Sequence, residues 1–291
     1  MSANDETSWT EVIRPKKKRL SINLIELFKY KDLIGLFVKR DFVSFYKQTV
    51  LGPFWYLLQP LIQTLVYSVM FGNIFSINEE IGIPSMLFFL SGTTTWWYFS
   101  QCVIKTSNTF TNNAHIFGKV YFPRLAVPVS VLLSNLIGWG IQFVMFVGFY
   151  FYYTGKGLVE FSMTLESLCL IPLLVINMAA LGLGIGLVIS SLTTKYKDFK
   201  QFIGFGIQLM MFASPVIVPM PIVYKKFPNW AQDILEYNPM TGVIEGFRAA
   251  FFNNYQFEIG DLTYSLSLAF LLLFFGVVIF NRTERNFMDT V

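Results

Sequence analysis

The polar side chains within the long apolar runs of this sequence are amides, hydroxyls and aromatic rings. Amides and hydroxyls hydrogen-bond to the hydroxyls of a sugar, and aromatic faces stack on sugar rings, so together they suit a path for a hydroxyl-rich solute. Trp and Tyr are also enriched at membrane interfaces, so the same rings could serve only as anchors. The polar candidates include Thr64, Ser68, Thr93, Thr94, Thr95, Asn135, Gln142, Asn177 and Gln208, and the predicted channel lining comprises Trp55, Tyr56, Gln59, Gln63, Tyr67, Trp96, Trp97 and Tyr98.

Side chains for ion coupling or catalysis are missing from these runs. Ion-coupled carriers need buried charged groups along their path, so coupling of transport to an ion gradient is disfavoured. The one histidine, His115, lies between two runs. The sequence also lacks a G-x-x-x-x-G-K-[ST] phosphate loop, a metal-ligand spacing and a catalytic constellation, which disfavours an enzyme. The stretches without Asp, Glu, His, Lys or Arg are 54–78, 84–104, 125–153, 167–192, 201–218 and 262–281.

Composition and run length indicate a polytopic membrane protein. Only 14% of the 291 residues are charged and 54% are apolar, whereas a soluble domain carries roughly 25% charged residues. Runs of about 20 apolar residues are long enough to span a bilayer as helices. We predict an all-α transmembrane domain at 55–281, between a cytoplasmic N-terminal part at 1–54 and a C-terminal tail at 282–291. Its six transmembrane helices are expected at about 55–75, 84–103, 125–153, 165–192, 202–218 and 262–280.

The distribution of basic residues predicts that both termini are cytoplasmic. With six spans, 18 of the 22 Lys and Arg residues fall on the inner side and four on the outer side, as the positive-inside rule requires. Cys102 and Cys169 then lie at opposite membrane faces, so no disulfide is expected between them. In the fourth span, small residues at close spacing would let helix backbones approach one another; they are Gly182, Gly184 and Gly186.

A basic, aromatic stretch at 36–60 leads directly into the first span. Its first half has the spacing of an amphipathic helix, and a cationic helix with an aromatic face suits the lipid headgroup region. A solvated basic tail is the alternative. On a membrane, the cations of this interface helix would either anchor it or contact an anionic lipid headgroup, and the sequence is compatible with both roles. These cations are Lys39, Arg40 and Lys47.

The segment at 219–253 contains two apolar stretches of a length typical of re-entrant or interfacial helices, at 222–235 and 240–252. Asn238-Pro239 predicts a turn between them, so we predict a hairpin that dips into the membrane from the outer side. An ordinary outer loop on the headgroups is the alternative. Glu245 and Arg248 are three residues apart and would pair on one helix face. The prolines that break the preceding helix are Pro215, Pro219 and Pro221.

Three stretches, in order along the chain, carry motifs of one known family. The first runs from Lys39-Arg40-Asp41 through Tyr46-Lys47 to Leu51-Gly52-Pro53-Phe54-Trp55, with Gln59-Pro60. The second is the stretch at 112–124, with its lysine-x-x-phenylalanine-proline-arginine core, and the third runs from Asn238-Pro239-Met240 to Gly246-Phe247-Arg248. Together they resemble the permease subunits of ABC type-2 polysaccharide exporters, which handle O-antigen, capsule and teichoic-acid chains. One departure is the uncharged stretch at 135–142, where an acidic residue is expected.

The resemblance implies a subunit of the bacterial inner membrane that works as two copies with two copies of an ATPase. The ATPase would bind ATP and Mg, so this chain would be no enzyme and hold no cofactor. The substrate would be a lipid-linked polysaccharide that enters from the inner leaflet, and no nucleic acid is involved. A coupling segment at 105–124 would dock on the ATPase through Asn113, His115, Ile116, Phe117, Gly118, Lys119 and Arg124, and the hairpin would form an outer gate with Asn238, Pro239, Glu245 and Arg248.

Two alternatives remain. A member of the same family could export drugs or small lipids. An integral membrane enzyme that modifies glycans would need a catalytic carboxylate or histidine, for which Glu245 and His115 are the candidates.

Overall fold

The computed structural model consists of helices in all the parts of the chain that it describes, namely 24–47, 49–72, 74, 81–117, 119–120, 122–162, 164–196, 198–253, 255 and 257–287, and no strand occurs there. This confirms the predicted all-α fold. Of the predicted site residues, Gly118 lies outside these ranges. The helices are α1 (Leu24–Lys29), α2 (Lys31–Lys47), the 3-10 helix η1 (Gly52–Phe54), α3 (Trp55–Phe71), α5 (Ser85–Ser107), α6 (Thr109–Phe117), α7 (Ala126–Gly155), α8 (Leu165–Lys195), α9 (Phe199–Phe212), α10 (Met220–Lys226), α11 (Asn229–Glu236), α12 (Pro239–Phe251) and α13 (Ile259–Phe287).

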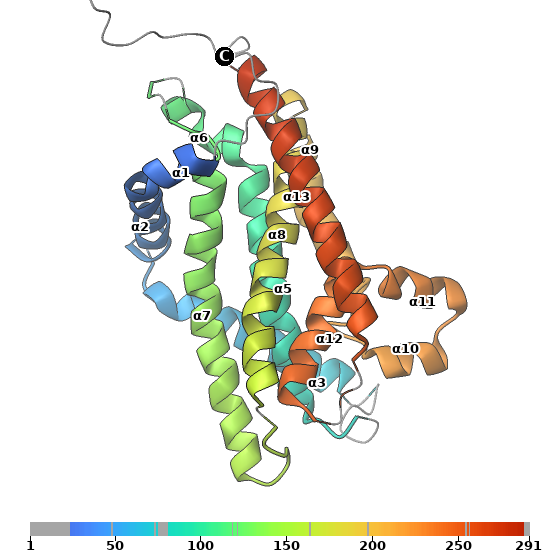
Figure 1. Ribbon diagram of the computed structural model, residues 1–291. Helices are drawn as coiled ribbons and strands as arrows, with labels where there is room; N and C mark the ends of the chain where they lie inside the picture. Colours follow the sequence, from blue (N-terminus) through green and yellow to red (C-terminus); the bar gives the residue numbers. More distant parts are fainter. Residues whose placement is uncertain are drawn as a thin grey trace, which may run out of the picture.

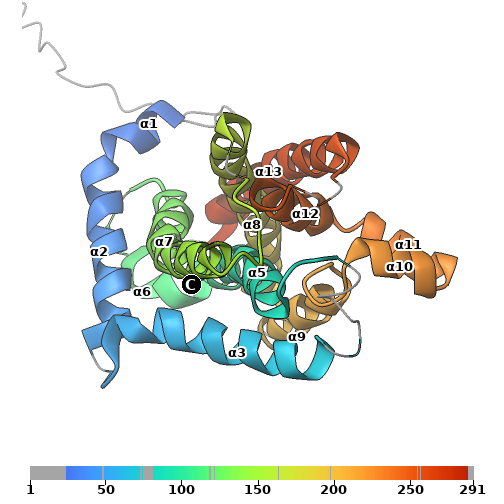
Figure 2. The same ribbon diagram turned by 90° about the horizontal axis from the view of Figure 1, so that it is seen from below.

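Helix α5 lies inside the bundle, in contact with α3, α7, α8, α9 and α12 (Figures 1 and 2). Several of its hydroxyl groups bond within the helix: Thr93 Oγ1 donates to the carbonyl of Phe89 and Thr95 Oγ1 to that of Ser91, both over 2.9 Å. The hydroxyls of Thr94 and Thr106 are buried without a hydrogen-bond partner among the described residues. Because neighbouring helices cover α5 and several of its hydroxyls bond to its own backbone, these polar side chains are kept from lipid.

Helix α8 is held tightly between α5 and α13 by glycines. A Cβ atom at Gly182 would come within 2.6 Å of Cys102 Cβ in α5, and one at Gly184 within 2.7 Å of the backbone of Leu272 in α13. Gly276 of α13 faces Gly184 in return, since its own Cβ would lie 2.7 Å from the Gly184 carbonyl oxygen. The predicted close approach of helices at these small residues is therefore present.

Four helices among the described residues are long and apolar enough to cross a membrane, and they coincide with the predicted first, third, fourth and sixth spans. The predicted second span is α5, whose polar composition reflects its burial. The predicted fifth span is α9, whose 14 residues rise about 21 Å, less than the roughly 30 Å of a hydrocarbon core. Six crossings therefore stay a prediction. The four helices are Gly52–Phe71, Ala126–Gly155, Leu165–Thr194 and Ile259–Glu284.

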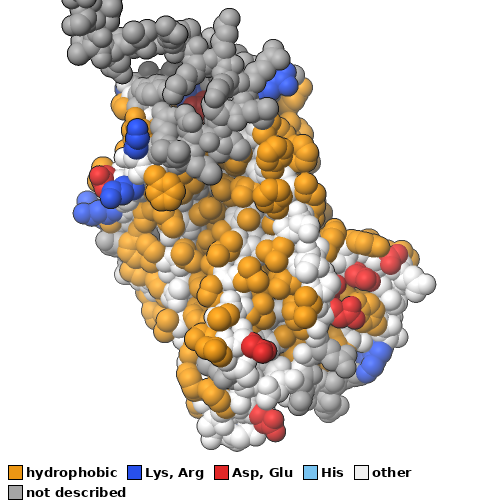
Figure 3. All heavy atoms as spheres, viewed as in Figure 1, with side chains coloured by type: hydrophobic (Ala, Val, Ile, Leu, Met, Phe, Trp, Pro, Cys, Tyr) orange, Lys and Arg blue, Asp and Glu red, His pale blue; other side chains and the backbone are white. Residues whose placement is uncertain are grey.

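Hydrophobic side chains cover most of the visible face of the bundle in Figure 3. The charged side chains in that view lie near the two ends and on the projecting segment formed by α10 and α11. This pattern is typical of helices that face lipid along their middle.

The segment between α9 and α13 forms three short helices instead of the two stretches predicted. Pro228 separates α10 from α11, because a proline ends a helix at the residue before it. Helix α12 is buried against α5, α8 and α13, whereas α10 and α11 project from the side of the bundle (Figures 1 and 2). The two arms of the predicted hairpin therefore differ in environment.

Helix α2 packs along α7 and leads into α3 at a corner of the bundle (Figure 2). Gly52, at the corner, has a φ of 52°, a left-handed conformation that favours glycine. Ile34 and Phe37 of α2 are buried, while Lys39 and Arg40 are exposed, as expected for an amphipathic helix. Helices α1 and α6 and the end of α13 gather at one end of the molecule (Figure 1).

The contact between α8 and α13 leads to a first prediction. Gly184→Ala should destabilise the protein by about 1–3 kcal/mol, because the added methyl group has no room beside the α13 backbone. Thermal unfolding in detergent measures the effect. Gly204→Ala in α9, where a Cβ atom meets nothing within 4 Å, is the control. Equal unfolding temperatures for the two variants would contradict the tight contact.

Candidate functional site

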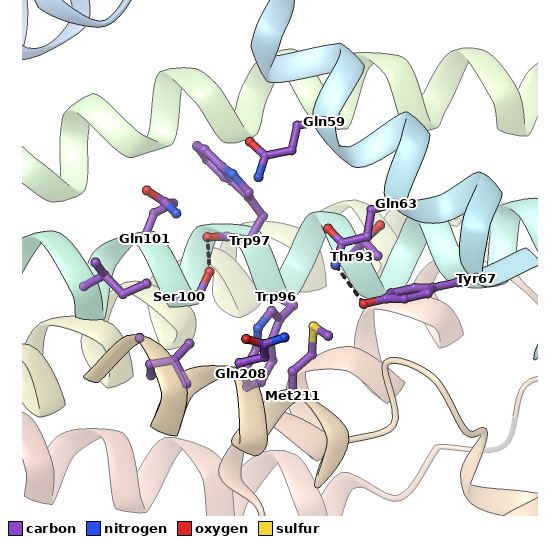
Figure 4. Close-up of a pocket in the computed structure, with 13 residues that line it drawn as sticks. Gln59, Gln63, Tyr67, Thr93, Trp96, Trp97, Ser100, Gln101, Gln208 and Met211 are labelled. Carbon is purple, nitrogen blue, oxygen red and sulfur yellow. Dashed lines mark hydrogen bonds between the residues drawn. The ribbon is translucent and has the colours of Figure 1, made fainter. Parts of the chain in front are cut away.

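A partly open cavity of about 220 Å³ lies between α3, α5 and α9 (Figure 4). One wall, α3, belongs to a helix long and apolar enough to cross a membrane, yet the cavity is lined largely by polar and aromatic groups. Its thirteen lining residues are Gln59, Gln63 and Tyr67 of α3, Thr93, Trp96, Trp97, Ser100, Gln101 and Ile104 of α5, and Gly204, Ile207, Gln208 and Met211 of α9.

One of the four glutamine side chains that line the cavity is hydrogen-bonded to another described residue, and the other three are not. Gln63 Nε2 donates to the Tyr67 hydroxyl over 2.9 Å, within α3. The amides of Gln59, Gln101 and Gln208 make no hydrogen bond to any other described residue. Each of these three amides therefore offers a carbonyl acceptor and two N–H donors to a bound molecule.

The indole of Trp97 is held rigidly at the cavity wall. It meets the Tyr56 ring edge-on, with centroids 5.6 Å apart. Gly138 of α7 provides the space for this pair, because a Cβ atom there would come within 2.7 Å of both rings. Trp96 packs against Phe99 of the same helix, with centroids 5.3 Å apart. Both tryptophans thus enter the cavity from packed positions that limit their movement.

The structure brings five of the eight predicted channel-lining residues to the cavity. Tyr56 lies behind Trp97, Trp55 is 39% exposed at the start of α3, and Tyr98 is buried with its hydroxyl directed at the Leu132 carbonyl of α7, 3.5 Å away. The five that line the cavity are Gln59, Gln63, Tyr67, Trp96 and Trp97.

Sequence reasoning missed two polar residues of the lining, Ser100 and Gln101, and named Gln208 only as a polar candidate. Gln101 follows Trp97 by four residues and so shares its helix face, a signal that the sequence did contain. No such signal marks Gln208, because its position depends on α9 lying against α5.

The other polar residues predicted in the spans join helices away from the cavity. Asn177 Nδ2 donates to Ser265 Oγ over 2.7 Å and links α8 to α13. Asn135 Oδ1 accepts a 2.7 Å hydrogen bond from Lys105 Nζ and links α7 to α5. Gln142 is fully buried, and neither of its amide atoms has a partner among the described residues.

The predicted outer-gate residues form a buried polar network around Arg248, which is fully buried. Its Nη1 lies 3.1 Å from Glu245 Oε1 and 2.7 Å from the Pro215 carbonyl oxygen, and the guanidinium stacks on Phe88 of α5 at 3.6 Å. Tyr255 donates to the same Glu245 oxygen over 2.9 Å. Arg248 therefore joins α12, α5 and the loop after α9.

Burial and hydrogen bonding act in opposite directions on the pKa of Glu245. This residue lies in α12, a helix too short to span a membrane. Burial raises the pKa of its carboxyl to about 7, and the nearby Arg248 guanidinium and Tyr255 hydroxyl lower it. At the start of the same helix, Asn238 Oδ1 caps the Met240 N–H over 3.0 Å, and Pro239 takes the first helical position, which suits its missing N–H. The Asn-Pro motif thus sets where α12 begins.

Helix α6 presents one face to the bundle and one to solvent. Asn113 is buried and donates to the Thr109 carbonyl over 3.0 Å, and Phe117 is 2% exposed. His115 and Lys119 are exposed and Ile116 is half-buried. Of the predicted coupling residues, His115 and Lys119 are therefore the ones most available to another protein.

The buried face of α6 is attached to the end of α13. The rings of Phe110 and Phe280 stack with centroids 4.6 Å apart. Arg124 donates to the Glu284 carbonyl oxygen over 2.6 Å and lies over the Phe117 ring at 5.4 Å. Arg124 therefore fixes the coupling segment to the last helix and is largely hidden from solvent.

The predicted interface cations lie on the exposed side of α2. Lys39, Arg40 and Lys47 are all exposed. Arg40 pairs with the neighbouring Asp41 at 2.8 Å and lies over the Phe37 ring at 4.8 Å.

The two residues suggested for an enzyme do not form a site. Glu245 is buried in the Arg248 network, whereas His115 is exposed on α6. Within the described ranges, no group of three or more His, Cys, Asp or Glu residues could hold a metal ion.

Comparison with known proteins relates the chain to membrane permeases. A model of the ABC-2 type transporter family matches residues 32–252. The O-antigen export system permease protein RfbA of Klebsiella pneumoniae is 28% identical over 93% of this chain and 98% of its own length. RfbA of Myxococcus xanthus is 22% identical over 91% and 98%, and the polysialic acid transport protein KpsM of Escherichia coli is 23% identical over 82% and 89%.

The Arg248 network yields a second prediction. Arg248→Met should destabilise the protein by about 1–3 kcal/mol, because it removes buried hydrogen bonds to Glu245 and to the Pro215 carbonyl and leaves these acceptors without that donor. Thermal unfolding in detergent measures the loss. The double variant with Glu245→Met should recover part of it, since the Glu245 carboxyl is then no longer buried without its arginine partner. Arg282→Met, at an exposed position on α13, is the control, and an Arg248 variant as stable as this control would refute the role.

Proposed function

Because the chain belongs to the ABC-2 type transporter family, we propose that it is the membrane-spanning permease subunit of an ATP-driven exporter of lipid-linked polysaccharide in a bacterial inner membrane. The relatives named above are permease proteins of O-antigen export systems and a polysialic acid transport protein, and they align with this chain over most of their length. That alignment supports the same kind of transport here.

The cavity between α3, α5 and α9 carries the proposal. Its unbonded amides and its two fixed indoles present the groups that bind a sugar, namely hydrogen-bonding amides and flat aromatic faces. A carrier of drugs or small lipids would need a mainly apolar cavity instead. The set of Gln59, Gln101 and Gln208 with Trp96 and Trp97 therefore favours a hydroxyl-rich polymer.

An identical second copy would complete the passage. Gln59 and Gln208 are exposed in the single chain, on helices whose neighbouring side chains are apolar. An amide that faces lipid costs several kcal/mol. The face that carries Gln59 and Gln208 must therefore contact polar protein groups or water. A second chain that applies its own α3 and α9 to this face provides such groups.

The energy would come from two copies of a partner ATPase, which supply ATP and Mg binding. Helix α6 and the turn after it offer an exposed surface with His115 and Lys119, and the buried face of α6 is attached to α13. We assign this end to the cytoplasm together with both termini, and we assign the hairpin of α10 to α12 to the outer gate. In this arrangement six helices cross the membrane, including α5 and α9.

A deletion experiment tests the proposed function. Cells that lack this subunit should accumulate lipid-linked glycan inside and lose it from their surface, because synthesis continues without export. Surface labelling and extraction of the lipid-linked pool measure the two quantities. Unchanged glycan with altered drug tolerance would instead identify an exporter of small molecules.

The cavity predicts a graded version of this defect. Trp97→Ala should lower the surface glycan of complemented cells by about threefold to tenfold, since one aromatic contact contributes roughly 0.5–1.5 kcal/mol. Phe270→Ala is the control, because Phe270 is an aromatic residue 70% exposed on α13, outside the cavity. Equal export by the two variants, at equal membrane levels, would exclude Trp97 from the passage.

The coupling surface is tested by charge reversal. Lys119→Glu should weaken co-purification of the ATPase at least about tenfold, because a like or missing charge at a docking surface costs binding energy. Membrane insertion should be unchanged, since Lys119 is exposed. Lys156→Glu, in the exposed turn at the opposite end of α7, is the control. Normal co-purification of the ATPase with the Lys119 variant would contradict the assignment of this segment to the docking surface.

A further inference from the structure

The cavity between α3, α5 and α9 is polar but carries no charge. Among its thirteen lining residues there is no Asp, Glu, Lys, Arg or His. On the premise that the proposed function holds, we infer that the glycan segment that passes through it is itself uncharged, and that the exporter selects neutral polymers against polyanions.

The selection follows from the cost of moving an anion past these side chains. A carboxylate removed from water loses several kcal/mol of solvation unless a cation or several N–H groups replace the water. Passages that conduct anions therefore carry rings of Arg or Lys. Here the available donors are the amides of Gln59, Gln101 and Gln208, which suit sugar hydroxyls and leave a carboxylate without a counterion.

Two cations close to the lining residues of α5 are engaged elsewhere. Lys105 follows the lining residue Ile104, but its ammonium group bonds to Asn135 on α7, 2.7 Å away. Arg248 lies close to Gly92, next to the lining residue Thr93, but its charge is balanced by Glu245 at 3.1 Å. Neither cation lines the cavity.

A second copy of the chain would not change this balance. It would bring the same three helices to the passage, and their lining portions, residues 59–67 of α3, 93–104 of α5 and 204–211 of α9, contain no Asp, Glu, Lys, Arg or His. Lys105 and Lys200 lie near the ends of α5 and α9, beyond these portions. A passage built from two such faces would be as neutral as the cavity in one chain.

The inference is tested with the complete exporter, this chain with its own ATPase, in cells that lack other polysaccharide exporters. One strain makes a lipid-linked neutral hexose polymer and the other makes lipid-linked polysialic acid, which has one carboxylate per sugar. Surface polymer per cell, measured against the internal pool, should be at least about tenfold higher for the neutral polymer.

Two variants at one position connect the preference to the cavity. Gln208→Lys places a cation in the lining and should narrow the difference between the two polymers. Gln208→Met removes the amide without adding a charge, and it should leave the difference in export between the two polymers as large as in the natural chain. A preference that persists unchanged in Gln208→Lys would show that selection occurs outside the cavity, and would overturn the inference.

The outcomes separate this inference from the proposed function. Comparable export of both polymers by the natural chain would overturn the neutral preference and leave the export function in place. Export of neither polymer would contradict the export function, and the inference would fall with it.

Discussion

Polar groups can lie at membrane depth only where other helices or water satisfy them, and this constraint explains the position of α5. It carries Ser91, the three consecutive threonines and both cavity tryptophans, and it is covered by α3, α7, α8 and α12. A polar group exposed to hydrocarbon costs several kcal/mol. Because the polar helix must be the central one, it touches the cavity on one side and the Arg248 network on another.

The two ends of the molecule are joined by helix α13. At one end it packs against α6 through Phe280, and the backbone carbonyl of Glu284 accepts a hydrogen bond from Arg124. At the other end, Gly242 of α12 lies so close to α13 that a Cβ atom would come within 2.6 Å of the Asp261 carbonyl carbon. One packed helix thus connects the surface assigned to the ATPase with the segment assigned to the outer gate.

Sequence periodicity predicted the long helices well because each needs only its own apolar length. Local chemistry also predicted the start of α12 at Asn238-Pro239 and the pairing of Glu245 with Arg248, since both depend on near neighbours. Helix spacing alone could have separated Tyr98 from Trp97, which points to a different face of α5. The bonds from Arg248 to the Pro215 carbonyl and the place of Gln208 depend on how helices pack, which spacing along one chain does not encode.

The unbonded glutamines have a consequence for how a long molecule would travel. The terminal amide of glutamine rotates freely between two orientations that exchange its donor and acceptor. Gln59, Gln101 and Gln208 can therefore meet a hydroxyl in either direction, whatever sugar of a repeating chain is opposite them. Each position of the polymer along these amides then has nearly the same energy, and the chain is not held at any one position. Such a wall suits stepwise sliding of a chain more than its tight retention.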